Sequence, residues 1–290
     1  MKCTLCPRSC GAERDGKTGA GFCRMPAGLR VARAALHHWE EPPISGKNGA
    51  GTVFFSGCTL RCCYCQNGDI SAGGQGRDIT PERLREIYFE LLGQGAHNIE
   101  LVTPTHFLPW ILPSLEPKLP VPVIYNCGGY EKEETLRLLE GKVDVWLPDL
   151  KYSDGALARE LSGAEDYFPV ACDAIREMFR QTGRPVYDGN GLMRRGVIVR
   201  HLVLPGYLDN TRRVLDWLAE TFAPGDVAVS LMSQYTPPPH MTGRLARRVT
   251  AAEYRAAVAY MRNCGIEDGF VQERTSAEEA YTPAFDGTGV

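Results

Sequence analysis

The chain has 290 residues, of which 43% are hydrophobic and 23% are charged, and its formal net charge is −3. This composition is typical of a globular protein with one large domain or two ordinary ones. The small net charge gives no general attraction for nucleic acid, and no segment approaches the roughly 20 apolar residues of a membrane-spanning helix. We therefore expect neither nucleic acid nor a membrane as a partner.

Cysteine usage indicates metal binding. The chain contains 11 cysteines, and an odd number argues against a complete set of disulfides. No secretory signal precedes the first of them, so we expect a cytoplasmic protein whose thiols stay reduced. Cys172 and Cys264 stand alone in the sequence and are expected to be buried free thiols.

Residues 1–45 are predicted to form a small cysteine-rich module. Four cysteines follow the spacing C-x2-C-x3-C-x12-C, namely Cys3, Cys6, Cys10 and Cys23. The segment has no hydrophobic period, so a bound metal would have to supply its folding free energy. Zinc and a second iron site both remain open, as does a flexible arm with scattered thiols, since structural zinc usually takes two C-x-x-C pairs. His37 and His38 are expected to pack in a linker.

Residues 46–290 alternate between short apolar runs and amphipathic segments. The predicted strands are 52–57, 98–104, 121–126, 143–151, 196–206 and 226–235, with a short last one at 270–274. The predicted helices are 80–95, a proline-broken segment to 118, 131–140, a stretch to 183 interrupted at Phe168–Pro169, 209–222 and 250–263. Six such repeats indicate an α/β fold, a partial (β/α)6 TIM-like barrel with a parallel sheet inside. No G-x-G-x-x-G fingerprint follows the first strand, which weighs against a dinucleotide-binding fold.

Polar residues gather where the predicted strands end. In parallel barrels the chemistry lies at this rim. The strand ends are followed by Cys58–Cys65, Thr103, Thr105, His106, Asn126, Cys127, Asp149, Lys151, His201 and Ser233–Tyr235.

The first of these loops places Cys58, Cys62 and Cys65 at CxxxCxxC spacing. Three thiolates can hold three irons of a cubane cluster and leave the fourth iron open, whereas ferredoxin-type clusters use four cysteines. Catalytic zinc normally takes histidine or carboxylate beside sulfur, so a structural zinc is the alternative. The extra thiol, Cys63, is expected to be a buried bystander.

The segment "GCTLRCCYCQN" strongly resembles the cluster loop of radical S-adenosylmethionine (radical SAM) enzymes. The further order of "YNCGGY", "LPDLKY", "RHLVLPG" and "FDGTGV" resembles the branch close to pyruvate formate-lyase activating enzymes. The resemblance implies a [4Fe–4S] cluster on Cys58, Cys62 and Cys65, with S-adenosylmethionine on the open iron. It also implies that S-adenosylmethionine is cleaved reductively to give a 5′-deoxyadenosyl radical. The electron would come from a low-potential donor such as flavodoxin or ferredoxin, and the substrate would be the glycine of a glycyl radical enzyme.

The resemblance also assigns cosubstrate-binding residues. Tyr64 would lie beside the adenine, and Asp149 with Lys151 would form the family's Asp-x-Lys element. His201 and Asn126 would reach the same ligand. The alternatives are ordinary packing for Tyr64, a plain ion pair for Asp149–Lys151 and a core histidine for His201.

One element of the family is missing. Its glycine-rich segment with glutamate after the second strand is replaced by "TPTH", so we expect Thr103 or Thr105 to contact the cosubstrate amino group. His106 and Cys127 are candidates to face the substrate, and Cys127 could donate a hydrogen atom. Two other functions stay open: a radical SAM enzyme that modifies peptides or small molecules, and an iron–sulfur electron carrier or sensor. The polar rim argues against the carrier, because a carrier needs no such cavity.

Overall fold

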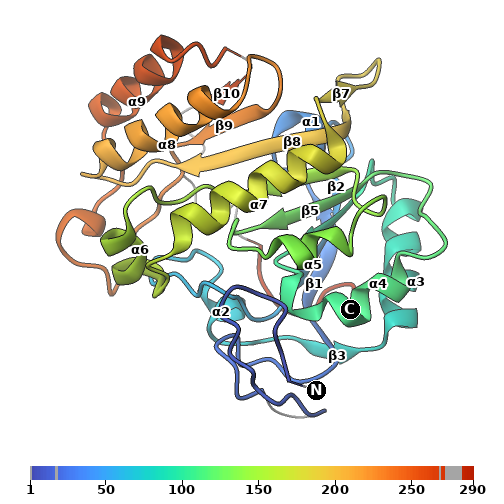
Figure 1. Cartoon of the computed structure of the whole chain (residues 1–290). Coiled ribbons are helices and arrows are strands. Elements are labelled where there is room, and N and C mark those ends of the chain that lie inside the picture. Colours follow the sequence, from blue (N-terminus) through green and yellow to red (C-terminus); the bar gives the residue numbers. More distant parts are fainter. Residues whose placement is uncertain (1, 17–18, 268, 272–282) are drawn as a thin grey trace.

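The computed structural model describes residues 2–16, 19–267, 269–271 and 283–290. It contains one sheet of ten strands, with the order β10-β9-β8-β6-β5-β4-β2-β1-β3 and with β7 paired to β8. The strands are β1 (Leu29–His37), β2 (Ala50–Phe55), β3 (Arg77–Ile79), β4 (Ile99–Val102), β5 (Val123–Cys127), β6 (Val145–Pro148), β7 (Val186–Tyr187), β8 (Met193–Leu202), β9 (Ala228–Met232) and β10 (Gly269–Val271). Figure 1 shows their arrangement.

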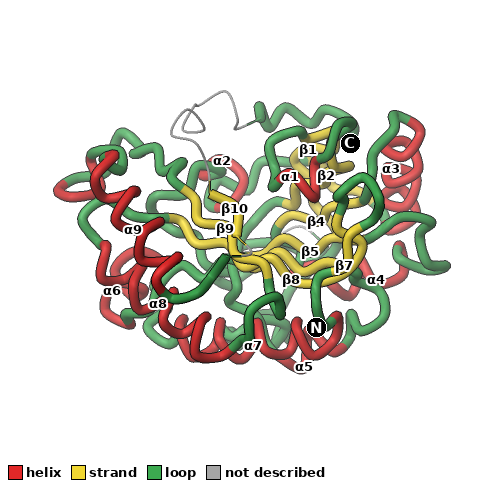
Figure 2. The backbone as a smooth tube through the Cα atoms, turned by 90° about the horizontal axis from the view of Figure 1, so that it is seen from above, coloured by secondary structure: helices red, strands yellow, loops and turns green. Residues whose placement is uncertain are grey.

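The helices alternate with the strands. They are α1 (Pro42–Ser45), α2 (Gly68–Ser71), α3 (Pro81–Gly93), α4 (Leu108–Ser114), α5 (Glu133–Arg137), α6 (Gly155–Ser162), α7 (Tyr167–Thr182), α8 (Leu208–Thr221) and α9 (Ala251–Asn263). Short 3-10 turns cover Thr105–Phe107 and Gly243–Ala246. Helices α3 to α9 lie along the outer side of the curved sheet in Figure 2, and α1 and α2 lie on its inner side.

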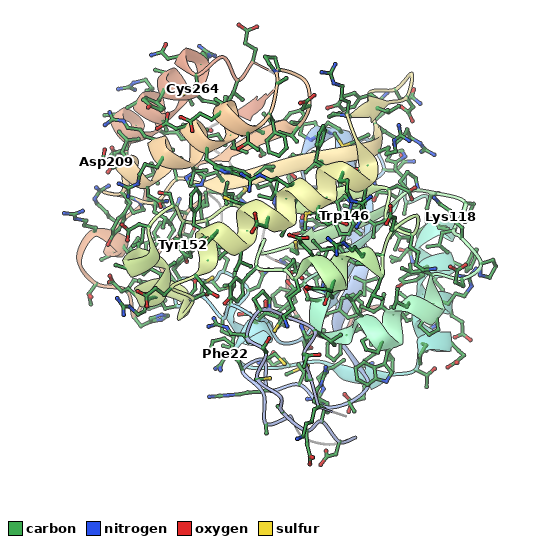
Figure 3. All side chains as sticks on the ribbon, in the orientation of Figure 1. Phe22, Lys118, Trp146, Tyr152, Asp209 and Cys264 are labelled. Carbon is green, nitrogen blue, oxygen red and sulfur yellow. The ribbon has the colours of Figure 1, made fainter. Side chains whose placement is uncertain are left out.

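The predicted barrel is confirmed. Strands β2, β4, β5, β6, β8, β9 and β10 are joined by parallel pairing. The ends of the strand order, β10 and β3, are not paired with each other, so the barrel is open along one side. Because parallel strands that are buried on both faces have continuous apolar sequences, these strands could be predicted from the sequence. Trp146 of β6, labelled beside α7 in Figure 3, is completely buried.

Local signals explain several element boundaries. The N–H of Arg83 donates to Oγ1 of Thr80 at 3.2 Å, and Pro81 occupies the first turn of α3, which the sequence predicted as a helix over 80–95. The predicted break at Phe168–Pro169 is wrong, because α7 runs through both residues. Pro169 lies in the first turn of α7, where backbone N–H groups have no hydrogen-bond partner within the helix, so a residue without an N–H is tolerated there.

Residues 29–37 form a strand that the sequence reading did not contain. β1 pairs antiparallel with β2, from Val31 opposite Phe55 to His37 opposite Ala50. The last residues of the chain lie along β1, where the N–H of Ala34 donates to the carbonyl of Thr288 at 2.9 Å. The predicted strand 270–274 is observed as β10, and its residues beyond Val271 lie outside the described part.

The end of the barrel opposite the cysteine loop is closed by an apolar plug. Ile44 of α1 packs with buried residues of the strands: Ala50, Ile124, Val145, Leu147, Met193, Ile198 and Ala228. These side chains point into the barrel, whereas the larger core fills the space between sheet and helices. The plug leaves the other end of the interior for polar side chains.

We expect Ile44→Ala to lower the free energy of unfolding by about 2–5 kcal/mol, because Ile44 is completely buried and the mutation leaves a cavity. The matched control is Leu138→Ala, whose side chain is 51% exposed and should change stability by at most about 0.5 kcal/mol. Urea unfolding followed by circular dichroism measures both. Equal losses in the two variants would contradict the plug.

Candidate functional site

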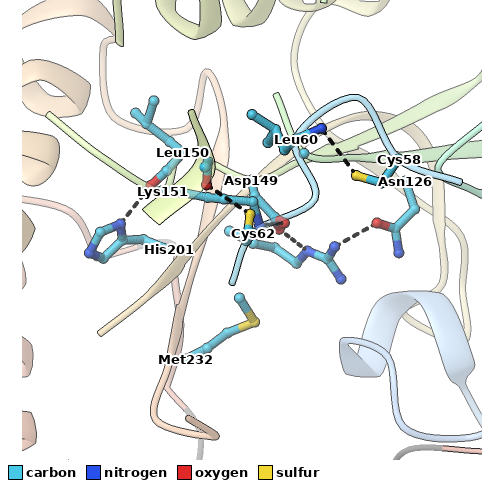
Figure 4. A network of polar contacts seen from close by, with 12 residues as sticks. Cys58, Leu60, Cys62, Asn126, Asp149, Leu150, Lys151, His201 and Met232 are labelled. Atoms are coloured by element: carbon cyan, nitrogen blue, oxygen red, sulfur yellow. Dashed lines mark hydrogen bonds and ion pairs between the residues drawn. The ribbon is translucent and has the colours of Figure 1, made fainter. Parts of the chain in front are cut away.

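The cysteine loop follows directly from the end of β2. All six residues of β2 are buried, and Gly57 then turns the chain with a φ of 80°. A Cβ atom at Gly57 would also collide with Cγ of Met25, so only glycine fits there. Cys58, Cys62 and Cys65 then line the same cavity, and Figure 4 shows the first two of them.

The thiols in this loop are desolvated. Burial, followed by the neighbouring Cys62, raises the pKa of Cys58 to about 12, and the same causes raise the pKa of Cys65. The Cys58 sulfur accepts the N–H of Leu60 at 3.3 Å, and the Cys62 sulfur accepts the hydroxyl of Ser162 at 3.0 Å. Because burial raises the pKa of Cys58 and Cys65, these two thiols are protonated without a metal, and metal binding would release their protons.

These three thiols fit an iron–sulfur cluster better than a single ion. Within the described residues, no three His, Cys, Asp or Glu side chains come close enough to hold one metal ion. Each thiolate of a cubane binds a different iron, so its sulfurs lie further apart than the ligands of one ion. The three cysteines share one cavity without histidine or carboxylate between them, which is the donor set of an open cluster.

Cys63 does not line the cavity. Its side chain is exposed, so the expectation that it would be a buried small hydrophobe is wrong. The backbone of Cys63 attaches the cysteine loop to neighbouring segments. Its N–H donates to the carbonyl of Leu161 at 2.9 Å, and its carbonyl lies 2.8 Å from Nε2 of His240.

A charged network lies beneath the loop. Nε of Arg200 donates to Asp149 at 2.9 Å, Nη1 to Glu40 at 3.0 Å and Nη2 to Asn126 at 2.6 Å. Figure 4 labels Asp149 and Asn126, two of these acceptors. The ammonium of Lys151 also contacts Asp149. Burial alone would raise the pKa of Asp149, but Arg200 and Lys151 hold it below its usual value. The predicted Asp149, Lys151 and Asn126 therefore come together at the cavity.

Arg200 was missed by the sequence reading, which chose its neighbour His201. Alternate residues of a strand point to opposite faces, and Arg200 points into the barrel while His201 points towards α8. The two ring nitrogens of His201 lie 2.6 Å from the carbonyl of Leu150 and 2.9 Å from Oγ1 of Thr211. His201 is thus a core histidine with both ring nitrogens paired, and not a cavity residue. Arg200 lies opposite Asp149 on the neighbouring strand, so the alternation of side chains along β8 could have identified Arg200 as the residue that faces the cavity.

The remaining predicted residues divide into two groups. Tyr64, Thr103 and Cys127 line the cavity, and the hydroxyl of Tyr64 accepts that of Tyr152 at 2.8 Å. Thr103 has a φ of 58°, which a threonine adopts only when the surroundings impose it. Thr105 and His106, the second group, form hydrogen bonds outside the cavity.

Thr105 and His106 do not reach the cavity. The hydroxyl of Thr105 donates to Glu131 at 2.7 Å, and Nε2 of His106 lies 2.7 Å from the carbonyl of Ser56. Both residues belong to the short turn after β4 and support the cysteine loop from behind. Of the two candidates for the cosubstrate amino group, the structure brings only Thr103 to the site.

The cavity itself has a volume of about 240 Å³. Sequence reasoning missed the part of its lining that comes from the segment after β1, namely His37, Trp39, Glu40 and Glu41. His37 was expected to be linker packing, but it ends β1 and faces the cavity. No local motif marks these residues; the only signal was the paired acids in "HHWEEPP".

The amino-terminal cysteines lie together against the cysteine loop. Burial raises the pKa of Cys6 to about 12, and the thiols of Cys3 and Cys23 add to the effect. The thiol of Cys10 in turn raises the pKa of Cys23, after burial. Cys3 and Cys6 are buried and Cys10 is exposed. The four residues lie in one region, but no three of these described side chains come close enough to hold one ion, and what they bind remains a prediction.

Arginines attach this module to the barrel. Nε of Arg8 donates to the carbonyl of Thr59 at 2.9 Å, and its guanidinium lies 3.9 Å from the centre of the Phe22 ring, which Figure 3 labels. Nη1 of Arg61 donates to the carbonyl of Phe22 at 3.3 Å. The module therefore contacts the loop that carries Cys58, Cys62 and Cys65.

The chain has relatives among known proteins. An uncharacterized protein of Methanocaldococcus jannaschii is 29% identical over an alignment of 246 residues, and the match covers 81% of this chain and 66% of that protein. No family model matches the chain. The chain thus spans about two thirds of the length of this curated relative.

Solved structures share its fold. Streptococcus suis SuiB bound to S-adenosylmethionine has a TM-score of 0.51 at 14% identity, over 75% of this chain and 48% of SuiB. SuiB has also been solved with its precursor peptide SuiA. Methylornithine synthase (PylB) has a TM-score of 0.51 at 16% identity, over 83% of this chain and 72% of PylB. At this level of identity the likeness establishes the fold, and it agrees with the fold that the resemblance to radical SAM enzymes implied.

A membrane-spanning helix was not expected, and in the described ranges no helix is both long and apolar enough to cross a membrane.

His201 generates a prediction about pH. Burial lowers its pKa to about 4, below the usual value of 6.5, so between these values the unfolded chain binds a proton that the folded protein does not. Stability must therefore fall as pH decreases through this window, by up to about 1.4 kcal/mol per pH unit for this group. We expect His201→Gln to be less stable than wild type at pH 7 and the difference to shrink towards pH 4.

Urea unfolding of both proteins at several pH values between 4 and 7.5 measures this difference. His240→Gln is the control, because its side chain is exposed. A stability difference between wild type and His201→Gln that stays constant with pH would show that His201 titrates normally in the folded protein.

Proposed function

We propose that this protein is a radical SAM enzyme. Cys58, Cys62 and Cys65 would hold a [4Fe–4S] cluster, and S-adenosylmethionine would occupy the cavity that they line. When bound, the reduced cluster supplies the electron that cleaves S-adenosylmethionine and yields the 5′-deoxyadenosyl radical. The observation that carries the proposal is that three thiols and a charged network share one cavity at the carboxyl ends of parallel strands, and that burial raises the pKa of two of these thiols, Cys58 and Cys65.

The residues around the cavity have separate tasks in this proposal. The ammonium of Lys151 lies beside the thiols and contacts Asp149, so it can neutralise a carboxylate of the cosubstrate. Asp149 is held ionised by Arg200 and Lys151 and can accept ribose hydroxyls or balance the sulfonium. Asn126 lines the same wall, and its amide is oriented by Arg200 and Glu100.

Aromatic side chains would enclose the adenine. Tyr64 packs against Tyr152 and Tyr235, with ring centres 6.5 Å and 6.0 Å away. Thr103 remains the proposed contact for the cosubstrate amino group. Together with Leu60 and Leu202, these side chains make the cavity wall partly apolar, which keeps water from a reactive radical.

The substrate is the finer part of the proposal. The resemblance to activating enzymes favours a glycine of a glycyl radical enzyme, and the structure of SuiB with a precursor peptide supports a protein or peptide substrate. Modification of a small molecule is the second candidate, which the likeness to methylornithine synthase favours. Flavodoxin or ferredoxin would supply the electron. A carrier without turnover needs no lined cavity and is the least supported function.

The first test is product formation. Protein reconstituted without oxygen, reduced and given S-adenosylmethionine should yield 5′-deoxyadenosine, measured by chromatography. Cys58→Ala, Cys62→Ala and Cys65→Ala should each lower the yield by at least about a hundredfold, because cluster ligands act as a unit. Cys63→Ala should keep near-normal yield, since its exposed thiol lies outside the cavity. No product from a cluster-loaded wild type would sink the enzyme proposal.

The amino-terminal cysteines are proposed to bind zinc or a second iron–sulfur cluster. The combined variant Cys3→Ala, Cys6→Ala should lose this metal while keeping the cluster on Cys58, Cys62 and Cys65. Metal and sulfide analysis separates the two alternatives. A zinc site predicts that wild type contains one more zinc ion per chain than the variant, and a second cluster predicts several more iron ions with a matching amount of sulfide. Cys172→Ala is the matched control, because it removes a buried cysteine elsewhere. Identical metal contents in all three proteins would refute a metal site in this module.

A further inference from the structure

The side of the cavity opposite the cysteine loop is formed by the segment between β1 and α1. β1 runs antiparallel to β2, so its last residue, His37, lies near the start of β2, whereas the cysteine loop follows the end of β2. Glu40 and Glu41 come next and are held in place by α1, whose Ile44 enters the plug. These two carboxylates therefore form the floor of the cavity beneath the proposed cosubstrate site.

Glu41 is a buried carboxylate without a full set of partners. The residue is 7% exposed and lines the cavity, and its Oε2 atom is buried without a hydrogen bond to any described residue. Arg200 is the neighbouring cation, but its three donor groups are directed at Asp149, Glu40 and Asn126. A buried, incompletely paired carboxylate costs free energy, so a site of this kind is expected to receive a partner from outside.

Among the described residues, the acidic side chains that line the cavity outnumber the lysine and arginine side chains. The charged side chains that line it are Glu40, Glu41, Asp149, Lys151 and Arg200. Lys151 pairs with Asp149, and Arg200 pairs with Asp149 and Glu40. His37 also faces the cavity, but burial lowers its pKa, so it adds no cation near neutral pH. Glu41 is thus the lining carboxyl group that forms no ion pair with another described residue.

An apolar wall stands beside this floor. Phe54, Ile70 and Val102 line the cavity and pack together as a small cluster of buried side chains. The site therefore combines a carboxylate with a surface for a short hydrocarbon chain. A ligand that matches both features has a positively charged nitrogen on an aliphatic chain.

We propose that the floor of the cavity binds the cationic nitrogen of the substrate, so that the substrate is an aliphatic amine, either free or as a lysine-like side chain of a peptide, in place of the glycine of a glycyl radical enzyme. Glu41 accepts the ammonium, and the chain lies along Phe54 and Val102 towards the cosubstrate. This inference rests on the proposed function for its placement of S-adenosylmethionine. The ammonium of S-adenosylmethionine is the other source of the same chemistry, and the test must separate the two.

The test measures binding of radiolabelled n-butylamine by equilibrium dialysis to the cluster-loaded protein, with S-adenosylmethionine present at saturation. We expect wild type to bind n-butylamine in preference to butyrate and 1-butanol. Glu41→Gln keeps the size of the side chain and removes its charge, so its affinity for n-butylamine should fall about tenfold or more. Glu86→Gln is the matched control, because this side chain is 65% exposed on α3, and it should bind as wild type does.

Three results would overturn the inference: equal affinity for n-butylamine in wild type and Glu41→Gln, butyrate bound as well as n-butylamine, or n-butylamine bound only when S-adenosylmethionine is absent. The last result would show that the floor of the cavity binds the ammonium group of S-adenosylmethionine and not that of a substrate. Thermal melting checks folding, and Glu41→Gln should melt no lower than wild type, because it replaces a buried carboxyl group whose Oε2 atom forms no hydrogen bond with a described residue.

Retention of S-adenosylmethionine by the same samples and 5′-deoxyadenosine formation without added substrate test the proposed function separately. If both persist while n-butylamine fails to bind, only the substrate inference is wrong. If deoxyadenosine formation fails while n-butylamine binding depends on Glu41, the amine site stands and the radical chemistry is wrong.

Discussion

The guanidinium of Arg200 is the interaction on which the polar interior of this barrel depends. It joins Asp149 at the rim, Asn126 on the wall and Glu40 on the floor, which come from three different parts of the chain. Without this cation, several carboxylates would be buried close together, and desolvation would force them to take up protons. Arg200 therefore keeps Asp149 ionised, and with it the group that the proposed cosubstrate site needs.

Two other features hold the cysteine loop above this network. The plug around Ile44 closes the far end of the barrel, and the amino-terminal module packs behind the loop through Arg8, Arg61 and Met25. The loop is thus fixed on one side by the sheet and on the other by a segment with little core of its own. A metal in the amino-terminal module would stabilise the loop indirectly, which gives the four additional cysteines a structural reason to be there.

The sequence predicted the barrel because buried parallel strands are apolar throughout and the helices between them are amphipathic. It also predicted the residues at strand ends, such as Asp149 and Asn126, since their position follows from the topology. It failed where the outcome depended on which face of a strand a residue occupies, as for His201 and Arg200. It also could not place Glu40 and Glu41, because β1 is an antiparallel addition that the βα pattern does not contain.

The central claim is that Cys58, Cys62 and Cys65 hold an open cluster to which S-adenosylmethionine binds. Electron–nuclear double resonance on the reduced, reconstituted protein tests it most directly, with S-adenosylmethionine labelled with nitrogen-15 at its amino group. The account predicts hyperfine coupling between the label and the cluster in wild type and in Cys63→Ala. A cluster that forms on these three cysteines but shows no coupling to the labelled amino group would contradict the account.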